Sequence, residues 1–336
     1  MKAKQLVFSG KMAVETVEVE VPDRPALGEI LVEQLYGLIS PGTELAMFTQ
    51  THVGFPRPDF GYARYPFYPG YASVGRVLLT GRGVDAVSEG DLVYVRGKHA
   101  SHSMISADRP PVKLPGNLTL EHAPFAVLAQ IALTAVRLSG VRLGHNVAVF
   151  GQGLIGNFAA QLMCLAGAGR VIGIDTIPER LAIAAACGVD DGVNPLVDNL
   201  MERIDNVTGG AGCQIVVEAT GNPQVAPQAI RAAAQMGQVV LLGSPRGSAE
   251  IDLYFDLHRT GVSVIGAHGS RQADARQFGD PDPHELMLDF IARGRLKVAP
   301  LLTHVLPASG AATAYRGLLE EKGAWLGVLL DLTRWE

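Results

Sequence analysis

Apolar residues follow two different periods along the chain, and the period changes near Glu121. Before this point, short runs alternate apolar and polar positions, which is typical of half-buried strands. Four such runs predict strands: Val17–Val21, Ile30–Leu35, Val74–Val77 and Leu92–Val95. Pro, Gly and aromatic residues crowd Gly54–Tyr71, which favours a long surface loop there. From Glu121 onward the spacing is helical, and Ala123–Leu138 is expected to form a helix.

Strands and helices then alternate, which predicts a parallel, doubly wound sheet and an α/β fold. The predicted strands are Val147–Phe150, Val171–Ile174, Ile215–Glu218, Val239–Leu242 and Val262–Ala267. The predicted helices are the Ala/Leu-rich segment after Gly156, Pro178–Cys187, Pro223–Met236 and the amphipathic His284–Arg293, which Gly294 ends.

The first strand of this alternation ends in Gly151-Gln152-Gly153-Leu154-Ile155-Gly156, and the second closes on Asp175, 19 residues after the last glycine. This order of strand, glycine turn, helix, strand and acid is the signature of a dinucleotide-binding unit. The first glycine permits the turn, the second lets backbone approach a pyrophosphate, and the third lets helix and strand pack closely. The start of the helix, at Leu154 and Ile155, offers N–H groups to phosphates.

Later strands end in further candidate cofactor residues, because ligands of such sheets bind at the carboxyl edge. These candidates are Thr220, Gly243, Ser244, Ala267 and His268. Asp175 favours NAD, since its charge would repel a 2′-phosphate, and NADP is the less favoured cofactor. Arg180 leaves NADP open because a nearby arginine accommodates that phosphate, although it also fits a solvated helix face.

Composition describes an ordinary globular protein rather than a specialised one. The 336 residues are 48% hydrophobic and 18% charged, with a formal net charge of −5, so neither nucleic acid nor an anionic membrane is an expected partner. The N-terminus lacks the apolar core of a secretory signal, and Ala123–Val136 is shorter than the ~20 residues of a membrane span. We therefore expect a cytoplasmic protein. Cys164, Cys187 and Cys213 are scattered and predict neither a disulfide framework nor a cysteine-rich zinc site.

The order of elements resembles the medium-chain dehydrogenase/reductase superfamily over nearly the full length. The supporting segments are Gly37–Glu44 (GLISPGTE), Pro69–Gly75 (PGYASVG), Gly90–Val93 (GDLV), the nucleotide motif and Ile291–Leu296 (IARGRL). The resemblance implies a mostly β, GroES-like catalytic domain at 1–129 and 270–336, and a Rossmann domain at 130–269. Members are usually dimers or tetramers, so a homodimer or homotetramer is expected, with Val262–Gly266 as a candidate pairing edge.

The departures from zinc-dependent members concern the metal ligands. This chain has Ser40 or Pro41 in place of their cysteine, and Tyr71-Ala72 in place of their His-Glu pair. Residues 73–125 contain none of the four cysteines of their structural zinc site. A catalytic zinc needs three N, S or O ligands from the protein, for which serine and tyrosine are poor substitutes. No metal is therefore expected, and the resemblance narrows to a zinc-independent branch.

The Ser40–Glu44 run and the aromatic loop look like the branch that includes sugar or cyclitol alcohol dehydrogenases and the bacteriochlorophyllide hydroxyethyl dehydrogenase. This implies an NAD-dependent oxidation of a secondary alcohol of polyol, sugar or cyclitol type, or reduction of its ketone. Two alternatives stay open: an NADPH-dependent quinone or enone reductase, and a non-catalytic nucleotide-binding protein. The loop aromatics could also form an apolar slot for a large planar substrate, or they could pack the loop onto the β domain.

Without a metal, a side chain must take the hydroxyl proton, and four candidates follow. Thr43 matches the hydroxyl residue that touches substrate in zinc relatives, or it is a satisfied turn residue. Tyr71 replaces a zinc ligand or fills its space. Glu44 accepts a substrate hydroxyl, or it forms an ion pair with Arg64 or Lys98. His99 is the best base by its ordinary pKa, and the resemblance places it on a strand with His102, facing the opposite side.

Overall fold

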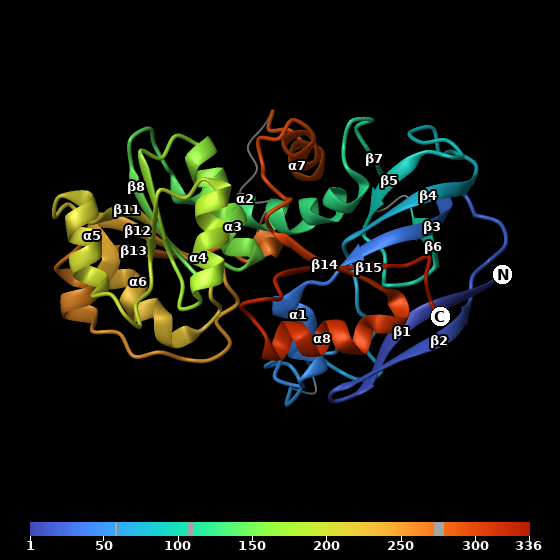
Figure 1. Cartoon of the computed structure of the whole chain (residues 1–336), viewed down its shortest axis with the longest axis horizontal. Coiled ribbons are helices and arrows are strands. Elements are labelled where there is room, and N and C mark those ends of the chain that lie inside the picture. Colours follow the sequence, from blue (N-terminus) through green and yellow to red (C-terminus); the bar gives the residue numbers. More distant parts are fainter. Residues whose placement is uncertain (58, 107–110, 272–278) are drawn as a thin grey trace. The chain divides into compact units, whose positions relative to one another are not determined.

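The parallel sheet predicted for the middle of the chain is present in a computed structural model of the protein, which describes residues 1–57, 59–106, 111–271 and 279–336 (Figure 1). Within these residues its strands lie in the order β10-β9-β8-β11-β12-β13, and every neighbouring pair is parallel. Chain order reverses between β8 and β11, which is the topological switch point of a Rossmann sheet. The strands are β8 (Asn146–Phe150), β9 (Arg170–Ile174), β10 (Asp191–Val193), β11 (Cys213–Glu218), β12 (Ala233–Leu241) and β13 (Ser263–Gly266).

Helices connect these strands, and the core under them is apolar because parallel strands are buried on both faces. They are α2 (Ala126–Ser139), α3 (Leu154–Leu165), α4 (Pro178–Cys187), α5 (Leu200–Thr208), α6 (Ala226–Ala232) and the short η2 (Pro223–Val225), η3 (Leu253–His258) and η4 (Gly269–Arg271). The observed sheet and the mostly β part confirm the predicted fold class.

The rest of the described chain is mostly antiparallel sheet. One sheet has the order β14-β15-β3-β4-β5-β7 with β6 paired to β3, and β1 pairs with β2. Its strands are β1 (Lys2–Gly10), β2 (Ala13–Glu20), β3 (Glu29–Leu38), β4 (Ser73–Thr80), β5 (Leu92–Val95), β6 (His102–Ser106), β7 (Val112–Lys113), β14 (Leu302–Pro307) and β15 (Gly327–Asp331). Its helices are α1 (Pro41–Phe48), η1 (Leu120–Phe125), α7 (Pro283–Ala292), η5 (Ala308–Gly310) and α8 (Ala311–Glu320).

Two units result. The β-rich unit comprises Met1–Val127, His284–Gly294 and Leu302–Glu336, and the parallel-sheet unit comprises Leu128–Pro283 and Arg295–Leu301. The sequence placed all of 270–336 with the β domain, whereas two parts of that range belong to the parallel-sheet unit. The side-chain amide of Gln161 on α3 accepts the Lys297 N–H at 2.7 Å and donates to the Lys297 carbonyl at 3.1 Å. These two bonds join Arg295–Leu301 to the parallel-sheet unit. Arg137 Nε on α2 lies 3.5 Å from Asp280 Oδ2, and this ion pair joins Asp280 to the same unit.

Two local predictions were wrong. The helix expected over Pro223–Met236 ends at Ala232, because Ala233 pairs with Cys213 of β11 and the chain enters β12. His99 precedes β6 rather than lying on a strand. Pro41 occupies position N1 of α1, to which proline is well suited, so Thr43 lies in the first turn of a helix.

The apolar segment at Ala123–Leu138 is longer than the sequence indicated. Among the described residues, Leu120–Ser139 is one helical stretch of 20 residues that meets the length and hydropathy of a membrane span. Its most apolar window is 72% buried inside the structure, as expected of a core helix.

Candidate active site

The glycine turn after β8 has the backbone that its sequence predicts. Gly151 has φ +87°, a left-handed conformation that favours glycine. A Cβ at Gly156 would lie 1.7 Å from the Gly151 carbonyl oxygen, so only glycine lets α3 begin this close to the strand. A Cβ at Gly153 would meet no atom nearer than Arg180 Nη1, at 4.0 Å. The backbone at Gly153 is therefore open on the side where a pyrophosphate would approach.

Asp175 follows β9 directly and is 8% exposed. Its Oδ2 accepts the Gln152 N–H at 2.7 Å, and its Oδ1 accepts the Ile177 N–H at 2.9 Å. The carboxylate is thus fixed against the glycine turn, and each oxygen keeps a second lone-pair site for a ribose hydroxyl. Arg180 Nη1 lies 4.0 Å from Oδ2, and burial lowers the pKa of that guanidinium while the Asp175 charge raises it. Arg180 therefore forms an ion pair with Asp175 beside the glycine turn and is not a solvent-exposed charge on the helix surface.

The remaining predicted cofactor residues lie where the sequence placed them, after the carboxyl ends of three adjacent strands. Thr220 follows β11, Gly243 and Ser244 follow β12, and Ala267 and His268 follow β13. Gly243 packs so closely that a Cβ there would lie 2.4 Å from the Gly221 nitrogen. With Gly153 and Asp175, these residues form one edge of the sheet, and the arrangement fits a dinucleotide.

Glu218, the last residue of β11, is a buried acid at this edge. Its Oε1 accepts the Thr220 N–H at 2.7 Å and the Thr220 hydroxyl, whereas its buried Oε2 has no partner among the described residues. Burial raises the pKa of this carboxyl, and the bonds from Thr220 partly oppose the rise.

In the β-rich unit, Glu44 is the centre of a buried hydrogen-bond network. Its Oε1 accepts the Ser40 N–H at 3.0 Å, and its Oε2 accepts the Tyr315 hydroxyl at 2.6 Å. His99 Nε2 lies 3.1 Å from the same Oε2, and because a carboxylate only accepts, this nitrogen carries the proton. Glu44 is 1% exposed, and His99 and Tyr315 are fully buried. Glu44 thereby joins α1 to α8 and to the chain before β6.

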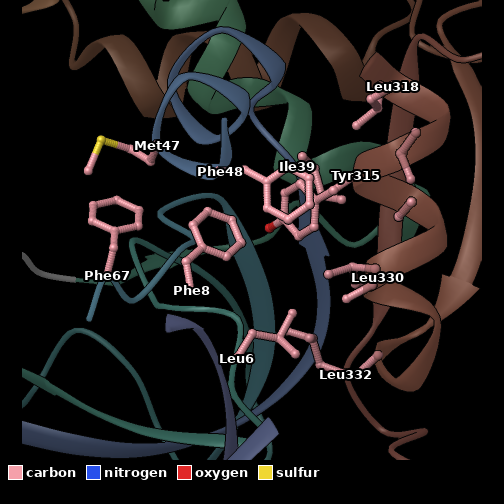
Figure 2. Close-up of a cluster of buried hydrophobic side chains, with 14 of the residues drawn as sticks. Leu6, Phe8, Ile39, Met47, Phe48, Phe67, Tyr315, Leu318, Leu330 and Leu332 are labelled. Carbon is pink, nitrogen blue, oxygen red and sulfur yellow. The ribbon is translucent and has the colours of Figure 1, made fainter. Parts of the chain in front are cut away.

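Tyr315 reaches this network from the hydrophobic core of the unit. Its ring packs edge-on against Phe8 at 5.0 Å and stacks on Phe48 at 5.4 Å, and Figure 2 shows it in the middle of the apolar cluster. Burial, together with the negative charge of Glu44, raises the pKa of its phenol well above the usual value. Tyr315 therefore stays a hydrogen-bond donor to Glu44.

Next to this network lies a second group, made of hydroxyls. The Tyr71 hydroxyl donates to Ser40 Oγ, and the Thr43 hydroxyl is also bonded to Tyr71. Burial raises the pKa of Tyr71 to about 12; the Ser40 bond lowers it, and the Glu44 charge raises it further. Tyr71 and Thr43 are half-buried, so they are accessible in a way that Glu44 and His99 are not.

The structure thus places Thr43, Glu44, Tyr71 and His99 in two neighbouring groups. Glu44 and His99 belong to the buried network, and Thr43 and Tyr71 belong to the hydroxyl group. The donors on Glu44 are Ser40, His99 and Tyr315, whereas the sequence named Arg64 or Lys98 as its ion-pair partners. The Lys98 ammonium lies 5.8 Å from the centre of the Phe67 ring. Sequence reasoning missed Tyr315, which is 271 residues from Glu44, and no local pattern marks it.

The residues present do not fit a catalytic zinc ion. In the part of the chain that the structure describes, no three His, Cys, Asp or Glu side chains gather in a group that could hold a metal. Glu44 and His99 are adjacent, but the third side chain at that point is a tyrosine whose phenol stays protonated. A zinc site needs three deprotonated or neutral ligands and room for substrate.

Comparisons with known proteins show that the chain is similar to dehydrogenases. A profile of the family described as zinc-binding dehydrogenase matches residues 155–280. The chain is similar to the D-guloside 3-dehydrogenase of Escherichia coli strain K12, at 26% identity over 95% of this chain and 96% of that protein. It is also similar to an alcohol dehydrogenase of Geobacillus stearothermophilus, at 28% identity over 88% of this chain and 90% of that one.

Solved structures share the fold over the whole length. A structure described as a zinc-binding dehydrogenase from Sinorhizobium meliloti 1021, solved with NADP bound, superposes with a TM-score of 0.82 at 20% identity, over 98% of this chain and 99% of that one. An alcohol dehydrogenase from Escherichia coli CFT073, solved with NADH, gives 0.82 at 19% identity and the same coverage.

Proposed function

We propose that this chain is a member of the medium-chain dehydrogenase/reductase superfamily, an NAD-dependent enzyme that transfers a hydride between a secondary alcohol and its cofactor without zinc. The observation that carries the proposal is the buried Asp175 carboxylate, held beside an open Gly153 at the switch point of the sheet. The similarity to a guloside dehydrogenase and to an alcohol dehydrogenase supports a substrate of polyol, sugar or cyclitol type.

Four sets of residues would hold the cofactor. The N–H groups at Leu154 and Ile155 would face the pyrophosphate, with Gly151, Gly153 and Gly156 keeping the backbone close to it. Asp175 would accept the adenosine ribose hydroxyls, and the residues after β11, β12 and β13 would line the rest of the dinucleotide. When bound, the nicotinamide supplies the acceptor for a hydride. Relatives of this fold bind NADP or NADH, and the charge of Asp175 favours NAD.

The protein supplies the route for the hydroxyl proton. The Tyr71 phenol, with a pKa of about 12, keeps its own proton at neutral pH. It therefore accepts the proton of the substrate hydroxyl only while passing its own proton to the Thr43 hydroxyl, which in turn gives its proton to water. Thr43 is half-buried and can reach water, whereas Ser40 is 5% exposed and holds the phenol in place by accepting its hydrogen bond. The alcohol loses a hydride and a proton and becomes a ketone.

Glu44, His99 and Tyr315 are positioning residues in this account. Glu44 holds the backbone of Ser40, which is the residue that accepts from Tyr71. His99, before β6, and Tyr315, on α8, both bond to the Glu44 carboxylate. They therefore fix the position of Ser40 at the start of α1. The described residues do not supply the three protein ligands that a catalytic zinc needs. This supports proton transfer through the hydroxyl group instead.

We also propose that the enzyme is a cytoplasmic homodimer or homotetramer. The exposed edge strand β13, with Val264 at 41% exposure, and the exposed Leu253, Tyr254 and Phe255 support pairing of the parallel-sheet unit with a second copy. Size-exclusion chromatography with light scattering measures the assembly directly.

Replacing Asp175 with alanine tests both the nucleotide site and the choice of NAD. We expect the Kd of NADH to rise about 10- to 100-fold, the effect of losing hydrogen bonds to a charged group, while the Kd of NADPH rises much less. Isothermal titration calorimetry with each nucleotide measures both Kd values.

Asp175→Asn keeps an acceptor for the Gln152 N–H, so it separates the effect of disrupting the glycine turn from the effect of losing the negative charge. Asp205→Ala, on the exposed face of α5, is the control. Equal weakening of both nucleotides would refute the ribose role, and NADPH preference in the unaltered protein would favour the reductase alternative.

A further inference from the structure

Glu218 is an acid in a row of apolar residues that crosses the parallel sheet at its carboxyl edge. It is fully buried at the end of β11, and it pairs in register with Phe150 of β8 and Leu241 of β12. The same row continues to Ile174 of β9. Burying a carboxyl group costs free energy unless its oxygens are bonded, so a residue kept for packing alone would be apolar here. A role beyond packing is therefore indicated.

Glu218 holds the chain that follows two neighbouring strands. Its Oε1 accepts the Thr220 N–H at 2.7 Å and also the Thr220 hydroxyl, in the turn after β11. Its backbone carbonyl accepts the Leu242 and Gly243 N–H groups at 2.8 and 2.7 Å, after β12. Its Oε2 forms no hydrogen bond with the residues that the structure describes, so the side chain acts on its surroundings through Thr220.

Thr220 in turn lies against the glycine turn after β8. A Cβ at Gly151 would lie 3.0 Å from both the nitrogen and Cγ2 of Thr220, so the bare backbone of the glycine packs on this threonine. Ala219 packs on the same turn one residue earlier, where a Cβ at Gly156 would lie 3.2 Å from the Ala219 Cβ. The position of Thr220 therefore sets how the glycine turn sits on the end of β11.

Further bonds lead from Thr220 to the loop after β12. Thr220 Oγ1 accepts the Asn222 N–H at 3.0 Å, and Asn222 Oδ1 accepts the Gln224 N–H at 3.1 Å. The Gln224 side-chain amide donates to the Ser248 carbonyl at 3.0 Å. One buried carboxyl group is thus the inner end of a series of bonds that joins the turns after β8 and β11 to the loop after β12.

Resting on the nucleotide site of the function proposed above, we propose that Glu218 is a positioning residue for the pyrophosphate of the bound dinucleotide. Its carboxyl group is too deeply buried to touch the cofactor, and it acts through Thr220, which keeps the glycine turn in place. Backbone N–H groups bind a phosphate only when they converge on it, so a displaced turn binds it less well. A misplacement of about 1 Å away from the chemistry can cost about 10²-fold in rate.

Two variants remove the bonds that hold Thr220. Glu218→Leu removes the acceptor at similar volume, and Thr220→Val removes the hydroxyl but keeps the N–H. Each is expected to raise the Kd of NADH and of ADP-ribose about tenfold or more, the effect of losing a hydrogen bond to an acid. The Kd of adenosine, which has no pyrophosphate, is expected to stay unchanged. Isothermal titration calorimetry measures the first two ligands, and an NMR titration measures adenosine.

A rescue variant and a matched control separate positioning from stability. Glu218→Gln keeps an acceptor for the Thr220 N–H and hydroxyl, so it is expected to bind NADH nearly as tightly as the unaltered protein. Val216→Ala removes packing from the core of the same strand without a contact to the turn. Its unfolding temperature is expected to fall while its Kd for NADH stays unchanged.

The outcomes distinguish this inference from the function on which it rests. The inference alone would be overturned by Glu218→Leu binding NADH as tightly as the unaltered protein, by failure of Glu218→Gln to restore binding, or by equal weakening of adenosine. If Glu218→Leu does not fold, Thr220→Val decides by the same measurements. An unaltered protein that binds NADH but oxidises no alcohol would overturn the dehydrogenase function and leave the positioning role standing. An unaltered protein that binds neither NADH nor ADP-ribose would overturn both.

Discussion

Replacing Glu44 with alanine is expected to destabilise the β-rich unit by about 3–5 kcal/mol, because each buried donor that loses its acceptor costs about 1–3 kcal/mol. The change would leave three buried donors without an acceptor: the Ser40 N–H, the Tyr315 hydroxyl and His99 Nε2. Since folded proteins are stable by only about 5–15 kcal/mol, a large part of the margin would be lost. Thermal and urea unfolding, followed by circular dichroism, measure the effect.

Two further variants make this result specific. Glu44→Gln keeps an acceptor for the Ser40 N–H without a negative charge, so it should lose less stability than alanine. Glu89→Ala removes an exposed glutamate of the same unit and should change stability by less than about 0.5 kcal/mol. If Glu44→Ala unfolded at the same temperature and urea concentration as the unaltered protein, the network would not stabilise the β-rich unit.

Replacing Tyr71 with phenylalanine is expected to lower kcat by about 10²-fold or more, with a small change in KM, because the ring remains and only the proton-transferring hydroxyl is lost. Ser40→Ala should lower kcat in the same direction, since Ser40 Oγ accepts the Tyr71 hydroxyl. Steady-state rates of alcohol oxidation at saturating NAD measure both variants.

Tyr68→Phe is the control for this experiment, since it removes a phenol hydroxyl of the same loop that lies outside the hydroxyl group. Unchanged unfolding temperatures would show that the variants remain folded. If Tyr71→Phe kept the kcat of the unaltered enzyme, the proton would have to leave by another route, and the assignment of Tyr71 would be wrong.

The glycine turn after β8 and the position of Asp175 after β9 could be predicted because their requirements are local. Gly151 must adopt a positive φ, Gly156 has no room for a Cβ, and Asp175 follows the next strand within a fixed distance. Such requirements leave a trace in the order of residues along the chain. The strand order that confirms the Rossmann sheet follows from the same alternation of strands and helices.

The Glu44 network could not be predicted as a whole, because two of its partners, His99 and Tyr315, come from distant parts of the chain. Tyr315 looks like any apolar residue of an amphipathic helix, and His99 offered only its ordinary pKa as a reason to be chosen. Tertiary pairing likewise overrode the helical pattern at Ala233, which the sheet takes into β12. These misses concern long-range contacts, whereas the correct predictions concern short-range geometry.

The central claim is that hydride transfer to NAD proceeds here without zinc, and one measurement tests it most directly. NADH formation from a cyclic secondary alcohol would be followed by absorbance before and after exhaustive treatment with a chelator, with the zinc content of each sample measured. The account predicts the same rate in both samples and less than one zinc per chain. A rate that disappears with the chelator and returns on addition of zinc would contradict it.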